Sequence, residues 1–129
     1  MKQFVLHNFK TILWTIVVVG VCVVPGNEIP SPPIINIPHL DKIVHAGLYF
    51  ILTVFSVKSF SRQKLVPILN QKPYQSAFVY AVVLGVIVEL VQHYFIPTRS
   101  GDILDALANS TGSLLAILIL KKWKLSFIR

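Results

Sequence analysis

The segment His93–Gly112 reads HYFIPTRSGDILDALANSTG, and an apolar run lies on each side of it. The segment nevertheless contains Arg99, Asp102, Asp105 and Asn109. A charged side chain costs at least about 2.5–3.5 kcal/mol at the centre of a membrane-spanning helix. If the following run enters a membrane, these polar side chains therefore need partners within the protein, and those partners determine how the helices pack.

The composition of the whole chain is that of a membrane protein. Of its 129 residues, 54% are hydrophobic and 13% are charged, whereas soluble domains contain about 25% charged residues. The mean hydropathy is +0.70. The net charge of +7 comes from basic residues in short segments between apolar runs. Because no phosphate-binding loop or aromatic–basic motif accompanies them, we expect no nucleic-acid partner.

Four apolar runs are candidates for membrane-spanning helices, which need about 20 residues to cross about 30 Å. We predict an all-α integral membrane four-helix bundle that forms one domain over residues 1–129. Its spans are expected at about 9–24, 40–57, 76–96 and 103–120. The proline-rich segment 25–38 between the first two spans is predicted to be a loop.

The first run also has features of a signal peptide, because Lys2 and Lys10 precede it. No small-x-small cleavage motif follows, so we expect a retained membrane anchor.

Cys22 lies in this run and is the single cysteine of the chain. We expect Cys22 to be a buried, small hydrophobic side chain, and neither an intrachain disulfide nor a cysteine-based zinc site is possible.

Basic residues indicate how the spans are oriented. Most lie before the first span, between the second and third, or after the fourth: Lys2, Lys10, Lys58, Arg62, Lys64, Lys72, Lys121, Lys122, Lys124 and Arg129. The segments on the other side contain Lys42 and Arg99. Because basic loops stay in the cytoplasm, we expect both termini there. Trp14 and Trp123 are expected near the cytoplasmic membrane surface, which favours amphipathic rings.

Polar residues of the last three spans share one depth, at the non-cytoplasmic end. These residues lie at the start of the second and fourth spans and at the end of the third. Within each span they are three or four residues apart, which puts them on one face of the helix. We expect a polar cluster in which Lys42 and Arg99 pair with carboxylates. Its members are Asp41, Lys42, His45, Tyr49, Glu89, Gln92, Arg99, Asp102, Asp105 and Asn109. The small residues Gly112, Ser113 and Ala116 are expected to allow close helix packing.

Three segments resemble, in order, the VanZ-like family. They are DKIVHAGLY at Asp41–Tyr49, GVIVELVQ at Gly85–Gln92 and RSGDILDALANSTG at Arg99–Gly112. The family pattern is DK-x-x-H-x-x-x-Y, then E-x-x-Q, then R, then D-x-x-x-N-x-x-G. The family commonly has another glycine four residues later, where this chain has Ala116. By resemblance, the family positions are Asp41, Lys42, His45, Tyr49, Glu89, Gln92, Arg99, Asp105, Asn109 and Gly112.

The resemblance implies a multi-pass protein of the bacterial inner (cytoplasmic) membrane, and it implies no particular reaction. The founding family member is associated with low-level resistance to the glycopeptide teicoplanin. We therefore expect the cluster to bind a lipid headgroup, a lipid-linked cell-wall precursor or a glycopeptide. In that hypothesis Arg99 and Lys42 meet phosphate or carboxylate groups. A homo-oligomer is compatible with four short helices.

Two alternatives stay open. The chain could be an intramembrane enzyme for a lipid-linked substrate, with Glu89, His45 and Asp105 as candidate acids and bases. The same three side chains could hold a divalent metal, although the expectation is no metal and no cofactor. Alternatively, the polar residues only hold the helices together.

Overall fold

The structure, a computed structural model, describes residues 1–25, 39–98 and 102–123. Within these ranges it contains helices and no strand: α1 (Lys2–Val23), α2 (Leu40–Arg62), α3 (Pro67–Gln71), α4 (Pro73–Phe95) and α5 (Ile103–Trp123). Four of them, α1, α2, α4 and α5, are long and apolar enough to cross a membrane. The all-α, four-helix prediction is confirmed. The predicted loop beyond Pro25 and the residues Arg99, Lys124 and Arg129 lie outside the described residues.

The helices extend beyond the predicted spans at the ends that carry basic residues. α1 begins at Lys2 rather than near Phe9. Its polar first turns are compatible with a helix because Asn8 Nδ2 donates to the Phe4 carbonyl at 2.8 Å within the same helix. As a result Trp14 lies near the middle of α1, and its place at the cytoplasmic membrane surface stays a prediction.

The short helix α3 was not predicted from the sequence. It begins with Pro67 at the first helical position, where the fixed φ of proline fits and its missing N–H costs nothing. The connection from α2 is held by Gln63, whose Nε2 donates to the Val66 carbonyl at 2.7 Å and whose Oε1 accepts from the Val66 N–H at 2.9 Å. These bonds order the turn between α2 and α3.

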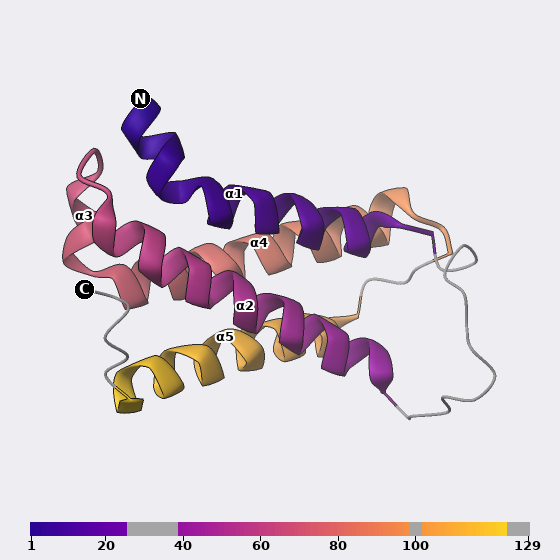
Figure 1. The fold of residues 1–129 in the computed structure, drawn as a ribbon. Helices are drawn as coiled ribbons and strands as arrows, with labels where there is room; N and C mark the ends of the chain where they lie inside the picture. Colours follow the sequence, from indigo (N-terminus) through magenta and orange to yellow (C-terminus); the bar gives the residue numbers. More distant parts are fainter. Residues whose placement is uncertain (26–38, 99–101, 124–129) are drawn as a thin grey trace.

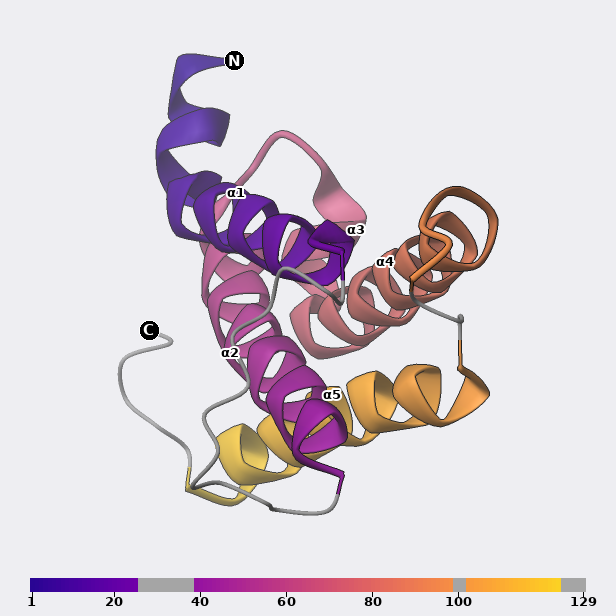
Figure 2. The same ribbon diagram turned by 90° about the vertical axis from the view of Figure 1, so that its right-hand side faces the viewer.

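α2 is the central helix of the bundle. It packs against α1, α4 and α5, most extensively against α5, whereas α1 and α5 lie on opposite sides of it (Figures 1 and 2). The core between α1, α2 and α4 contains buried apolar side chains: Val18, Cys22, Tyr49, Leu52, Ala81 and Val88. Cys22 is buried, as expected.

Polar side chains also connect the membrane-spanning helices. Thr11 Oγ1 on α1 lies 2.8 Å from Ser59 Oγ on α2. Thr15 Oγ1 lies 2.7 Å from the Tyr80 hydroxyl on α4, and Trp14 Nε1 donates to the Leu48 carbonyl at 2.9 Å. Such hydrogen bonds contribute to helix association in lipid.

The outward faces of the bundle are apolar. Large exposed side chains include Val79, Val83, Ile87, Leu107 and Leu118, which are 51–59% exposed. In water these faces would be unfavourable, whereas in a bilayer they contact acyl chains.

Candidate polar site

The end of the bundle formed by the first turns of α2 and α5 and the last turns of α4 carries most of the predicted cluster; we call it the polar end. Lys42 is the centre of an ion-pair network there. Its Nζ lies 3.2 Å from Asp41 Oδ2, 3.3 Å from Asp102 Oδ2 and 3.1 Å from Asp105 Oδ1. An ammonium group has three N–H donors, and three carboxylates surround this one. Lys42 therefore ties α2 to α5 and has no remaining donor for a phosphate.

Asp102 is the N-terminal cap of α5. Its Oδ1 accepts a hydrogen bond from the Leu104 N–H at 2.9 Å. This bond, together with the nearby Lys42 ammonium, holds the pKa of Asp102 below its ordinary value. The ionised side chain satisfies a free N–H at the helix start and complements the helix dipole. The sequence therefore positions Asp102 by local helix chemistry as well as by the ion pair.

Glu89 brings a carboxyl group from α4 into the space between the helices. Glu89 is 9% exposed, and its Oε2 accepts the backbone N–H of Asp102 at 3.0 Å. Its Oε1 is also buried and has no hydrogen-bond partner within the described part of the chain. A buried polar atom without a partner is unfavourable, so this oxygen is available to a ligand.

His45 on α2 and Asn109 on α5 form a buried pair, with His45 Nδ1 3.1 Å from Asn109 Oδ1. A carboxamide oxygen can only accept, so in this arrangement Nδ1 donates the bond, and in a neutral ring Nε2 then carries the lone pair. Gly85 on α4 provides the room, because a Cβ at residue 85 would lie 3.3 Å from Asn109 Nδ2.

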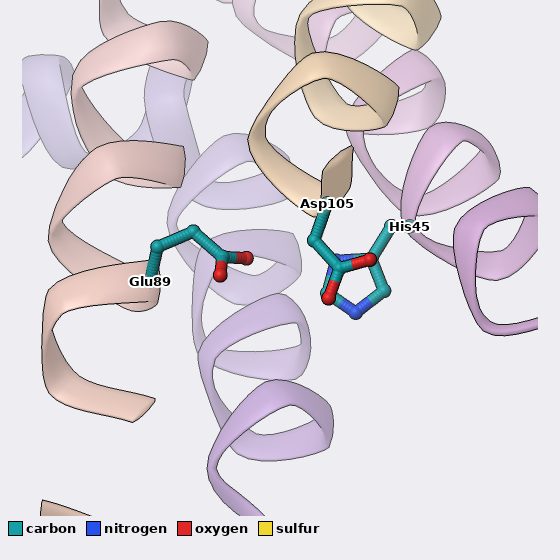
Figure 3. A group of neighbouring side chains, drawn as sticks. All are labelled: His45, Glu89 and Asp105. Atoms are coloured by element: carbon teal, nitrogen blue, oxygen red, sulfur yellow. The ribbon is translucent and has the colours of Figure 1, made fainter. Parts of the chain in front are cut away.

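Three of the predicted residues converge from three helices. One potential ligand atom of each of His45, Glu89 and Asp105 lies within 4.8 Å of the other two. Figure 3 shows the Glu89 carboxylate extending from α4 toward Asp105 and His45. This arrangement brings two carboxyl groups and one imidazole close enough for proton transfer through a ligand or for shared coordination of an ion.

Two other predicted site residues are positioned for packing. Tyr49 is fully buried in the core, and its hydroxyl has no hydrogen-bond partner in the described ranges. Gln92 Nε2 donates to the Cys22 carbonyl at 2.6 Å, which connects α4 to α1. Arg99, the remaining predicted member of the cluster, lies outside the described residues.

A family model, VanZ/LLP1, matches residues 3–126 of the chain. The chain belongs to the VanZ/LLP1 family. The match covers nearly the whole sequence and agrees with the resemblance found in the three motif segments. No curated protein and no solved structure shows a significant match. Together with the four apolar helices, this membership identifies a multi-pass membrane protein.

A groove between α4 and α5 opens beside the polar cluster of this VanZ/LLP1 protein. Its volume is about 250 Å³, and its lining includes Val86, Glu89, Leu90 and His93 from α4 and Asp102 and Ala106 from the α5 side. The groove was not predicted, because it forms where α4 and α5 meet and the spacing within each helix does not show that contact. Its exposed surface is almost entirely apolar, although Glu89 and Asp102 are among the residues that line it.

Proposed function

We propose that this chain is an envelope protein of the bacterial inner membrane that binds the polar headgroup of an amphiphile at the polar end, with the apolar part of the ligand in the groove between α4 and α5. The observation that carries the proposal is the position of Glu89. Glu89 is buried beside the ion-pair network and is also one of the residues that line the groove. A lipid-like molecule entering from the bilayer would place its apolar part against Val86 and Leu90, and its headgroup against carboxylates.

The charges of the polar end indicate what kind of headgroup fits. Among the described residues there, four carboxylates face one ammonium group, and Lys42 is fully engaged by three of them. The excess of acceptors favours a headgroup rich in hydroxyl, amide or amine donors over direct contact with a phosphate. Lipid-linked cell-wall precursors and lipid-bearing glycopeptides have such donors. We include low-level teicoplanin resistance in the proposal on this basis.

Native mass spectrometry of the detergent-purified chain tests binding. We expect a retained amphiphile on the unaltered protein and its loss in Ala106→Phe, which fills the groove from α5. The matched control is Leu107→Phe, since Leu107 is 57% exposed on the same helix and does not line the groove. Equal retention by both variants would show that the groove is not the binding site.

Resistance is tested by expressing the chain in a susceptible host and measuring the inhibitory concentration of teicoplanin. We expect Glu89→Gln to abolish any protection at unchanged membrane abundance, because the amide has no charge and replaces one of the two accepting oxygens with a donor. Val83→Ala, at an outward-facing position of α4, serves as the control. Full protection by Glu89→Gln would argue against a role of the polar end in resistance.

An intramembrane enzyme is the second candidate, and the proximity of His45, Glu89 and Asp105 favours it. An acid and a base within reach of one substrate are the minimum for general acid–base catalysis. Incubation of the purified protein with radiolabelled lipid-linked precursors would separate the two functions. Turnover that is lost in Glu89→Gln while the lipid stays bound would establish catalysis, whereas binding without turnover would support recognition alone.

A further inference from the structure

We propose that His45, Glu89 and Asp105 bind one divalent metal ion of the Mn²⁺ or Zn²⁺ class. Their ligand atoms lie within 4.8 Å of one another. Bonds from such ions to nitrogen and oxygen are about 2.0–2.2 Å long, so two ligands on one ion are at most about 4.4 Å apart. Small rotations of the side chains would bring ligand atoms that are up to 4.8 Å apart within this limit. This site departs from the sequence-based expectation of no metal.

The free oxygen of Glu89 points to a ligand that the protein itself does not provide. Glu89 Oε1 is buried and lacks a hydrogen-bond partner within the described ranges, although the residue is only 9% exposed. Figure 3 shows this carboxylate directed toward the other two side chains. A cation at the centre of the three groups would coordinate that oxygen and balance the charge of the two carboxylates.

Each proposed ligand is oriented by a second group. Asn109 Oδ1 accepts from His45 Nδ1 at 3.1 Å, which leaves Nε2 as the metal-binding nitrogen. The Asp102 N–H holds Glu89 Oε2 at 3.0 Å, and Lys42 Nζ holds Asp105 Oδ1 at 3.1 Å. Metal sites in proteins typically have such outer partners, which fix the ligand orientation and the histidine tautomer.

The ligand set indicates the class of ion. One imidazole and two carboxylates suit first-row divalent ions better than Ca²⁺, which prefers oxygen ligands alone. Three protein ligands leave coordination positions open for water or for an oxygen of a headgroup. The inference goes beyond amphiphile binding and does not depend on it, because the ion is held by side chains of the chain alone.

Titration of the detergent-purified full chain with Mn²⁺, followed by electron paramagnetic resonance of the free ion, tests the site. We expect one bound ion per chain, displaced by Zn²⁺. Glu89→Gln, His45→Gln and Asp105→Asn should each lower the affinity by more than about tenfold, and loss of the outer partner in Asn109→Ala should lower it by about 10–100-fold. The comparison is Asp41→Asn, which should lower the affinity less than any of the three ligand variants does. Asp41 contacts Lys42 but is not among the three proposed ligands.

Two results would overturn the proposal. One is a folded, unaltered chain that binds neither Mn²⁺ nor Zn²⁺. The other is an equal loss of affinity in Asp41→Asn and Asp105→Asn, which would indicate diffuse attraction to acidic groups. Circular dichroism checks that the variants are helical. If the variants do not fold, spin-echo spectroscopy of Mn²⁺ on the unaltered chain still decides, because a bound imidazole gives nitrogen modulation and its absence would exclude His45 as a ligand.

Discussion

Gly112 is the residue that determines how closely α5 approaches α2. A Cβ at this position would overlap the main-chain carbonyl of Ala46, and that carbonyl cannot move without displacing α2. Gly47, one residue further along α2, has no such role, because a Cβ there would meet nothing within 4 Å. The close approach matters for the polar end, since Asn109 lies one turn before Gly112 and His45 is next to Ala46.

We expect Gly112→Ala to destabilise the protein by about 1–3 kcal/mol, as overpacking does in other cores. Gly47→Ala should be neutral or stabilising, because alanine is favoured over glycine inside a helix by about 1 kcal/mol. Reversible unfolding in mixed micelles of mild detergent and dodecyl sulfate would measure both. Similar stability of the two variants would contradict the close contact at Gly112.

At the scale of the element, the first turn of α5 is held by side chains of two other helices, α2 and α4. Asp102 caps the Leu104 N–H from within the chain segment. Glu89 of α4 accepts the N–H of Asp102, and Lys42 of α2 contacts the carboxylates of Asp102 and Asp105. Side chains of α2 and α4 therefore stabilise the start of α5 in addition to its own cap.

The cap predicts different effects of two substitutions at residue 102. Asp102→Asn keeps a side-chain oxygen for the Leu104 N–H, whereas Asp102→Ala removes it, so the alanine variant should lose more stability. Hydrogen exchange of the first amides of α5 would show the difference, with faster exchange at Leu104 in Asp102→Ala alone. Equally fast exchange in both variants would mean that the charge, and not the hydrogen bond, holds the helix start.

At the scale of the whole molecule, the two ends of the bundle differ in charge and in structure. Met1, α3 and the last turn of α5 lie at one end (Figure 1), and this end carries basic residues that include Arg62, Lys64 and Lys121. The opposite end carries the acidic cluster around Lys42. The excess of Lys and Arg at one end predicts that this end faces the cytoplasm.

Cysteine labelling tests that orientation. In a Cys22→Ala background, a membrane-impermeant maleimide added to intact spheroplasts should label Thr98→Cys, at the polar end, and should not label Gln71→Cys, at the end of α3. Both positions are exposed, so access depends on the side of the membrane. The reverse pattern would place the termini outside and would exclude an outward-facing polar site. Labelling of both positions after the spheroplasts are lysed is the control.

Much of the fold was predictable because lipid imposes simple rules on a chain. Apolar runs of sufficient length must be helical in a bilayer, and this rule predicted four helices and their order. It could not predict the helix ends, where Asn8 and other polar residues bond within α1. The helix α3 was also missed, since a helix of five residues has no useful periodicity.

The sequence by itself determined that this is a four-helix membrane protein with ionisable residues at one depth, because hydropathy and the helical repeat are properties of each segment alone. Only the tertiary structure decided which of those residues meet. It placed Tyr49 and Gln92 in packing contacts and surrounded Lys42 with three carboxylates. It also brought His45, Glu89 and Asp105 together. The physical reason is that a helix face is set by local spacing, whereas contacts between faces depend on how α2, α4 and α5 cross. That crossing follows from close contacts, such as Gly112 against Ala46, between residues far apart in the chain.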